Sequence, residues 1–159
     1  MIDPTRLPKR AAIDSTILTR TRDDATGPDA ALCREFVESM ITSGKVVIAP
    51  AVCVMEFMRK APHEPPPRVE GFEVAAFDDQ AAYEVAGRFP PEVFKERPGT
   101  GAQNWLKFDT LVIATAVRHR AECLVTLDGD QKKLAERVGL QVRHPRDFED
   151  PQGSLPLDD

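Results

Sequence analysis

Four carboxylates stand in parts of the chain where charged side chains are rare. Each of the four most apolar segments carries one acid: Asp14 in 11–18, Glu56 in 46–58, Asp109 in 108–117 and Asp128 directly after 123–127. A lone carboxylate is costly to bury, so acids in core elements are usually paired with bases or bound to metal ions. The same segments contain no lysine or arginine. The four acids are therefore candidates for one shared site.

The elements that carry these acids are expected to place them at one edge of a sheet. Apolar runs predict strands, and helical spacing predicts helices between them; the strands are 11–18, 46–49, 71–76, 123–127 and 140–142, and the helices are 28–43, 50–60, 77–88, 108–120 and 130–138. This alternation indicates an α/β protein, a three-layer α/β/α sandwich around a mainly parallel central sheet. Ligands of such folds bind beyond the carboxyl ends of the strands, where Asp14 and Asp128 are expected.

The other two acids lie on predicted helices. Asp109 is expected at the start of the helix over 108–120, on the same side as Val112, Ile113 and Ala116. Glu56 lies one and a half turns into the helix over 50–60. All four acids can therefore converge. Two carboxylates about 4 Å apart repel by ~4 kcal/mol at an effective dielectric of ~20, so convergence predicts bound cations or raised pKa values.

Oxygen-only ligation selects hard cations, so the cluster predicts Mg²⁺ or Mn²⁺, as one or two ions. His63, His119 and His144 all lie outside the four apolar segments, which disfavours zinc or iron. A pair of divalent ions about 3.5–4 Å apart supports hydrolysis of a phosphodiester. The residue types thus point to nuclease chemistry.

The net charge has to be reconciled with a nucleic-acid substrate. The chain has 26 acids and 21 bases, and its formal charge of −5 by itself disfavours nucleic-acid binding. Two bound divalent ions add four positive charges, which brings −5 to −1. Four further acids lie in the C-terminal tail, at Glu149, Asp150, Asp158 and Asp159. The rest of the body is then slightly basic, so RNA is electrostatically allowed.

Length and composition predict one domain without a membrane segment. The 159 residues suffice for one core, with a polar N-terminal arm over 1–10, a nuclease-like domain over 11–148 and an acidic tail over 149–159. No apolar run approaches a membrane span, and the N-terminus lacks the apolar stretch of a secretory signal. Three widely spaced cysteines disfavour a disulfide framework. We therefore expect a cytoplasmic protein.

The ordered motifs IDST at 13–16, PAVCVMEF at 50–57, KFDTLVIATA at 107–116 and LVTLDGD at 124–130 resemble the PIN-domain family of ribonucleases, in particular the single-domain toxins of VapC type. The resemblance spans roughly 12–148. It implies that Asp14, Glu56, Asp109 and Asp128 are the catalytic, metal-binding acids, with Thr126, Ser15 and Thr16 in support and Asp130 as a second candidate for the fourth acid. It also implies an RNA substrate, a homodimer and an antitoxin that blocks the acidic pocket.

The leading hypothesis is a metal-dependent endoribonuclease that hydrolyses RNA phosphodiester bonds, the toxin of a type II toxin–antitoxin pair. Lys107 and Arg20 are candidates for gripping substrate phosphates. Trp105 is a candidate base-stacking platform, although a core or dimer-contact role is favoured. The alternative hypothesis is a non-catalytic PIN-like binding module that serves as an RNA or protein scaffold.

Each acid also has an ordinary structural explanation. Asp14 could cap a turn at a strand end, Asp109 could be a helix N-cap, and Glu56 could extend from a surface helix. Asp128 could belong to an Asp-Gly turn, in which case Asp130 is the better N-cap of the next helix. Capping does not exclude metal binding, so these alternatives stay open at the level of sequence.

Overall fold

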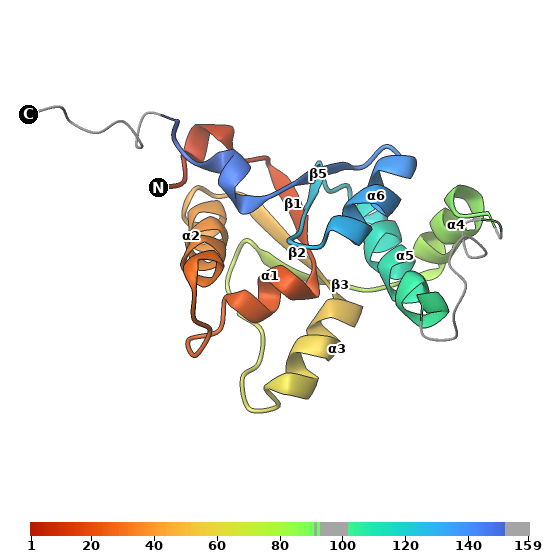
Figure 1. Cartoon of the computed structure of the whole chain (residues 1–159), viewed down its shortest axis with the longest axis horizontal. Coiled ribbons are helices and arrows are strands. Elements are labelled where there is room, and N and C mark those ends of the chain that lie inside the picture. Colours follow the sequence, from red (N-terminus) through yellow and green to blue (C-terminus); the bar gives the residue numbers. More distant parts are fainter. Residues whose placement is uncertain (91, 93–101, 152–159) are drawn as a thin grey trace, which may run out of the picture.

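The structure is a computed structural model that describes residues 1–90, 92 and 102–151; within the helix that starts at Ala102, side chains are described from Phe108 onward. Its centre is one sheet of five strands, in the order β3-β2-β1-β4-β5 (Figure 1). Every neighbouring pair is parallel. The strands are β1 Arg10–Ile13, β2 Val46–Pro50, β3 Phe72–Ala75, β4 Cys123–Val125 and β5 Gln141–Arg143.

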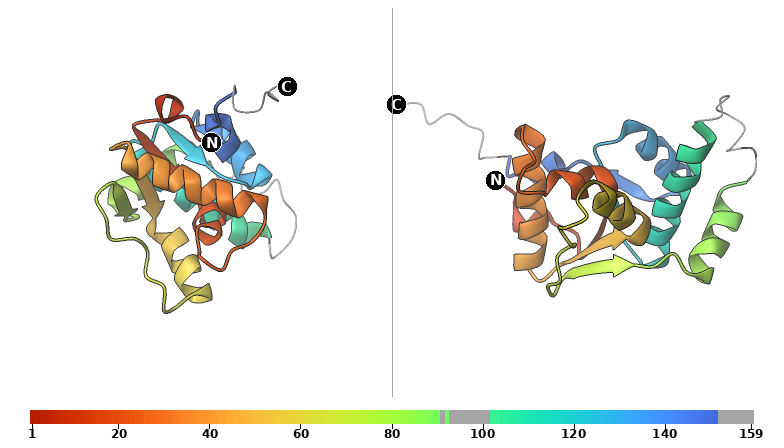
Figure 2. Two further views of the ribbon diagram at one scale, coloured as in Figure 1. Left: turned by 90° about the vertical axis from the view of Figure 1, so that its left-hand side faces the viewer. Right: turned by 90° about the horizontal axis from the view of Figure 1, so that it is seen from below.

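Six α-helices are described, together with two short 3-10 helices at the two ends of the chain. They are η1 Pro4–Arg6, α1 Ser15–Arg20, α2 Pro28–Thr42, α3 Ala51–Lys60, α4 Asp79–Arg88, α5 Ala102–Arg118, α6 Gly129–Arg137 and η3 Pro145–Phe148. Helix α2 covers one face of the sheet, and α4, α5 and α6 lie on the other side (Figure 1). Seen from below, α1 and α3 lie between these two layers (Figure 2). The predicted α/β/α sandwich is confirmed, and its sheet is parallel throughout.

Successive residues of a strand face opposite layers, and this divides the core in two. On β1, Ala11 and Ile13 belong to the cluster that packs against α1 and α2, whereas Ala12 belongs to the cluster under α5 and α6. The three central strands β1, β2 and β4 are almost entirely buried, as strands covered on both faces are, whereas the edge strands β3 and β5 have exposed residues. None of the helices in the described part of the chain combines the length and the apolar character needed to cross a bilayer.

The predicted strand over 11–18 is wrong in its second half. The chain leaves β1 after Ile13, and Asp14 caps helix α1 by accepting hydrogen bonds from the backbone N–H groups of Thr16 and Ile17. Ile17 and Leu18 are buried from this helix rather than from a strand. A short apolar run does not reveal such a change by itself, because its side chains are buried in either conformation.

Two predicted helix starts are also corrected. Helix α5 begins at Ala102, so Asp109 lies in its interior and is not an N-cap. The punctuation by proline and glycine ends at Gly101, and the helix starts directly after it. At α6 the N-cap is Asp128, whose Oδ1 accepts from the N–H of Asp130 at 2.8 Å, so Asp130 is not the N-cap.

The N-terminal segment packs onto the body of the protein. Ile2 and Leu7 are buried, and Ile2 forms an isolated antiparallel bridge with Glu149. Phe148, just before the predicted acidic tail, stacks on Phe36 of α2 with ring centroids 5.2 Å apart. The predicted N-terminal arm and the end of the predicted domain therefore both pack against the layer that contains α2; the tail beyond 151 lies outside the described residues.

Candidate functional site

One pocket lies at the carboxyl edge of the sheet, and all four predicted acids line it. Its volume is about 510 Å³. Asp14 follows β1, Glu56 lies on α3, Asp109 on α5, and Asp128 precedes α6. Ser15, Thr16, Val52, Arg59, Lys60, Phe108, Val112 and Gln131 complete the lining. The predicted convergence of four carboxylates on one place is therefore confirmed, while their roles as ligands stay predictions.

Asp14 is the most deeply placed of the four acids, with 3% of its surface exposed. Its Oδ1 accepts hydrogen bonds from the Thr16 N–H at 3.0 Å, the Thr16 hydroxyl at 2.6 Å and the Ile17 N–H at 3.1 Å. Its Oδ2 accepts from the Thr126 hydroxyl at 2.5 Å. Burial raises the pKa of the Asp14 carboxyl above its usual range, and the hydrogen bonds from Thr126 and Thr16 oppose this rise.

The two threonine hydroxyls also receive hydrogen bonds from the chain that follows β4. The N–H of Leu127 donates to the Thr16 hydroxyl at 3.2 Å, and the N–H of Asp128 donates to the Thr126 hydroxyl at 2.8 Å. Each hydroxyl therefore accepts a hydrogen bond from one backbone N–H and donates a hydrogen bond to Asp14. The supporting contacts predicted for Thr16 and Thr126 are present, and Ser15 lines the pocket.

The remaining acids are closer to solvent. Asp109 and Glu56 are half-buried, and Asp128 is exposed. The Nε2 of Gln131 lies 3.5 Å from Asp109 Oδ1, and Asp128 Oδ1 caps α6. Asp130 lies outside the pocket lining, and its carboxylate is 3.9 Å from Lys133 Nζ. The geometry therefore favours Asp128 over Asp130 as the fourth acid.

The described lining of the pocket contains two basic residues. Arg59 and Lys60, in the last turn of α3, line it. Arg20 is exposed at the end of α1 and lies outside the lining, and the side chain of Lys107 lies outside the described residues, as does that of Trp105. Phe108, 38% exposed, is the aromatic residue of the described lining.

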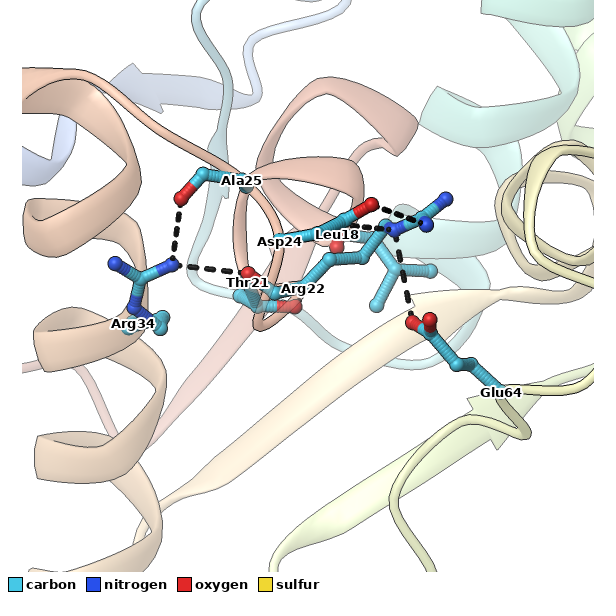
Figure 3. Close-up of polar contacts among 7 residues, drawn as sticks. All are labelled: Leu18, Thr21, Arg22, Asp24, Ala25, Arg34 and Glu64. Atoms are coloured by element: carbon cyan, nitrogen blue, oxygen red, sulfur yellow. Dashed lines mark hydrogen bonds and ion pairs between the residues drawn. The ribbon is translucent and has the colours of Figure 1, made fainter.

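An ion pair network links the segments that follow α1 and α3 (Figure 3). Arg22, after α1, donates two hydrogen bonds of 2.8 Å to Asp24, and its Nε lies 3.5 Å from Glu64, after α3. Arg34 of α2 donates to the carbonyls of Arg22 and Ala25. These contacts tie together α1 and α3, the two helices that carry the Ser15 and Glu56 walls of the pocket.

The donor set of the pocket fits a hard divalent cation by its chemistry. Four carboxylates, the Ser15 hydroxyl and the amide oxygen of Gln131 are all oxygen donors, and no histidine or cysteine is among the lining residues. In the part of the chain that the structure describes, no three acid, histidine or cysteine side chains stand close enough to hold a metal ion together.

Comparison with known proteins establishes the fold only. No family model and no curated protein matches the chain. Among solved structures, 14 chains match. One of them belongs to the crystal structure of VapBC2 from Rickettsia felis bound to a DNA fragment from their promoter, at 11% identity and a TM-score of 0.59. The match covers 85% of this chain and 98% of that one, so the two chains share a fold over most of their length.

Proposed function

We propose that this chain is a Mg²⁺- or Mn²⁺-dependent endoribonuclease and the toxin of a type II toxin–antitoxin pair. The observation that carries the proposal is the meeting of Asp14, Glu56, Asp109 and Asp128 in one pocket, from four separate elements. Helix capping accounts for Asp14 and Asp128, but it does not account for Asp109, which lies inside a helix. The fold shared with a chain of the VapBC2 complex supports the same assignment.

The four carboxylates are the residues that would hold one or two divalent ions. Such an ion, when bound, supplies a water nucleophile at neutral pH and stabilises the charge that develops on the phosphate. Asp14 has both oxygens fixed by Thr16 and Thr126, so its carboxylate is oriented before any ligand arrives. Asp109 and Glu56 line the same pocket from α5 and α3.

Substrate contacts are assigned to the basic and aromatic residues of the pocket lining, which lie on the same helices as Glu56 and Asp109. Arg59 and Lys60 supply positive charge for the phosphates on either side of the cleaved bond. Phe108 offers a ring face at the pocket, and aromatic rings stack on the bases of single-stranded RNA. The proposed substrate is therefore RNA in a single-stranded region.

Two partners belong to the proposal. One is an antitoxin that covers the acidic pocket, because the matched structure is a VapB–VapC pair on promoter DNA. The other is a second copy of this chain. Size-exclusion chromatography with light scattering tests the dimer, and a small reading frame directly beside this gene, co-expressed and co-purified, tests the antitoxin.

A cleavage assay on total RNA tests the nuclease. The parent should cleave with Mn²⁺ and stop when a chelator is added. Asp14→Asn and Asp109→Asn should lose cleavage while circular dichroism shows an intact fold. Asp23→Asn is the matched control, because Asp23 is exposed and lies outside the pocket lining. Cleavage by Asp14→Asn at the parent's rate would contradict the proposed mechanism.

One observation favours the alternative of a non-catalytic binding module. Among the described residues, the acids do not stand in a ready-made metal-binding arrangement. The Mn²⁺ affinity of the parent discriminates the two functions. Binding at micromolar to sub-millimolar metal supports the nuclease, and an absence of binding at millimolar metal supports the module.

A further inference from the structure

Gln131 is a buried polar side chain in the wall of the acidic pocket. It lies in the first turn of α6 and is 3% exposed. Its Oε1 has no hydrogen-bond partner, and it is the one buried side-chain oxygen or nitrogen among the described residues of which this is true. Native proteins seldom keep such an atom unless a water, an ion or a function accounts for it. Because Gln131 lines the acidic pocket, a ligand of that pocket is a candidate for the missing partner.

The contacts of Gln131 place it between two of the candidate metal-binding acids. Its Nε2 lies 3.5 Å from Asp109 Oδ1, and its backbone N–H lies 3.5 Å from Asp128 Oδ1. The amide has to be oriented this way, because the reverse would set its oxygen against the Asp109 carboxylate. Because the amide nitrogen donates to Asp109, the amide oxygen is an acceptor without a donor, close to the carboxylates of the pocket.

We propose that Gln131 is a positioning residue of a divalent cation site, an inference that rests on the proposed function. Its amide nitrogen holds the Asp109 carboxylate, and its amide oxygen accepts a hydrogen bond from the hydrated cation. A hydrated cation is the donor that a pocket of carboxylates attracts, and it satisfies the one buried acceptor that lacks a partner among the described residues. Groups that orient metal ligands in this way typically change metal affinity by about 10–100-fold.

Three variants of the full chain test the role of Gln131 by calorimetric titration with Mn²⁺ and by thermal melting of the metal-free protein. Gln131→Met keeps the length of the side chain and removes both polar atoms, so Mn²⁺ affinity should fall about 10–100-fold. The metal-free melting temperature should stay equal or rise, because the unpaired oxygen is gone. Gln131→Glu keeps an oxygen acceptor and should bind Mn²⁺ more tightly than Gln131→Met. Gln80→Met, at an exposed glutamine in the first turn of α4, should bind as the parent does.

The outcomes separate this inference from the proposed function. If the parent binds Mn²⁺ and Gln131→Met binds it equally well, Gln131 only packs α6 against α5 and the inference is overturned. A loss of affinity accompanied by a lower metal-free melting temperature also overturns it, because a packing role gives that result. If the parent itself binds no Mn²⁺ at millimolar concentration, the proposed function fails first and the inference falls with it.

Discussion

The Thr126 hydroxyl links Asp14 to the chain segment that carries Asp128. It donates to Asp14 Oδ2 at 2.5 Å and accepts from the N–H of Asp128 at 2.8 Å. Thr16 repeats the arrangement on the other carboxylate oxygen, donating at 2.6 Å and accepting from Leu127 at 3.2 Å. Two candidate ligands that are far apart in sequence are thus held relative to each other by two hydroxyl groups.

Removal of the Thr126 hydroxyl should destabilise the protein. Thr126 is 5% exposed, and Thr126→Val leaves a buried carboxylate oxygen and a backbone N–H without their partner. An unsatisfied buried group costs ~1–3 kcal/mol, so the free energy of unfolding in urea, measured with chelator present, should fall by about that amount. Thr126→Ser keeps the hydroxyl and should retain most of the stability. Equal stability of the Val and Ser proteins would contradict the linking role.

The free energy of unfolding of the metal-free protein should depend on pH through the titration of Asp14. Burial raises the pKa of this carboxyl above its ordinary value of 3.8, so the folded protein keeps a proton that the unfolded chain has released. Unfolding then releases a proton, and the parent loses stability as pH rises from about 3.8 through the folded pKa. Asp14→Asn has no such group.

The measurement for this titration is the free energy of unfolding of parent and Asp14→Asn across that pH range, with chelator present. The Asn protein should gain on the parent as pH rises, and the gain should level off once Asp14 is ionised in the folded state. Asp23→Asn, at an exposed site, should follow the parent at every pH. A gain that grows as pH falls would mean that the hydrogen bonds outweigh desolvation.

The sequence predicts the sheet and the pocket acids well for a physical reason. Strands of a parallel sheet are buried on both faces, so they appear as uninterrupted apolar runs, and one carboxylate in or beside each run is conspicuous. Asp14 and Asp128 follow β1 and β4, which are hydrogen-bonded neighbours, and this adjacency brings them together. The alternation of strands and helices predicts the common sheet edge, whereas the adjacency of β1 and β4 comes from the structure alone.

The remaining features depend on information that is not local. Ile17 and Leu18 are equally apolar in a strand and in a helix, so the turn at Asp14 is visible only through its capping bonds. Arg59 and Lys60 line the pocket because α3 packs against α1 and α5, and this packing joins elements that are far apart in the sequence. Gln131 gives no signal in the sequence, since a glutamine in the first turn of a polar helix is ordinarily solvated. Only its burial marks it.

Arg59 and Lys60 should contribute to the salt dependence of RNA affinity. Each cation that neutralises a phosphate of a single strand adds about 0.7 to the slope of log affinity against log salt concentration. The double variant Arg59→Gln, Lys60→Gln should therefore lower that slope by up to about 1.4. Fluorescence anisotropy with a short single-stranded RNA measures it, in the Asp14→Asn background to prevent cleavage. The matched control Lys9→Gln, Arg68→Gln also removes one lysine and one arginine charge, but from exposed positions outside the pocket lining. It should leave the slope unchanged.

Phe108 should contribute to affinity through stacking rather than through charge. Its ring is 38% exposed at the pocket, directly before Asp109 in the chain, so a base that stacks on it brings its phosphate toward the acids. Stacking of one base on an aromatic ring contributes ~1–3 kcal/mol, so Phe108→Ala should weaken binding of single-stranded RNA by that amount with little change in the salt slope. Phe108→Trp should restore binding. Phe77→Ala, at a ring of similar exposure that lies outside the pocket lining, serves as the control. Equal losses at Phe108 and Phe77 would show that no base stacks in the pocket, and RNA recognition would then rest on the phosphate contacts of Arg59 and Lys60 alone.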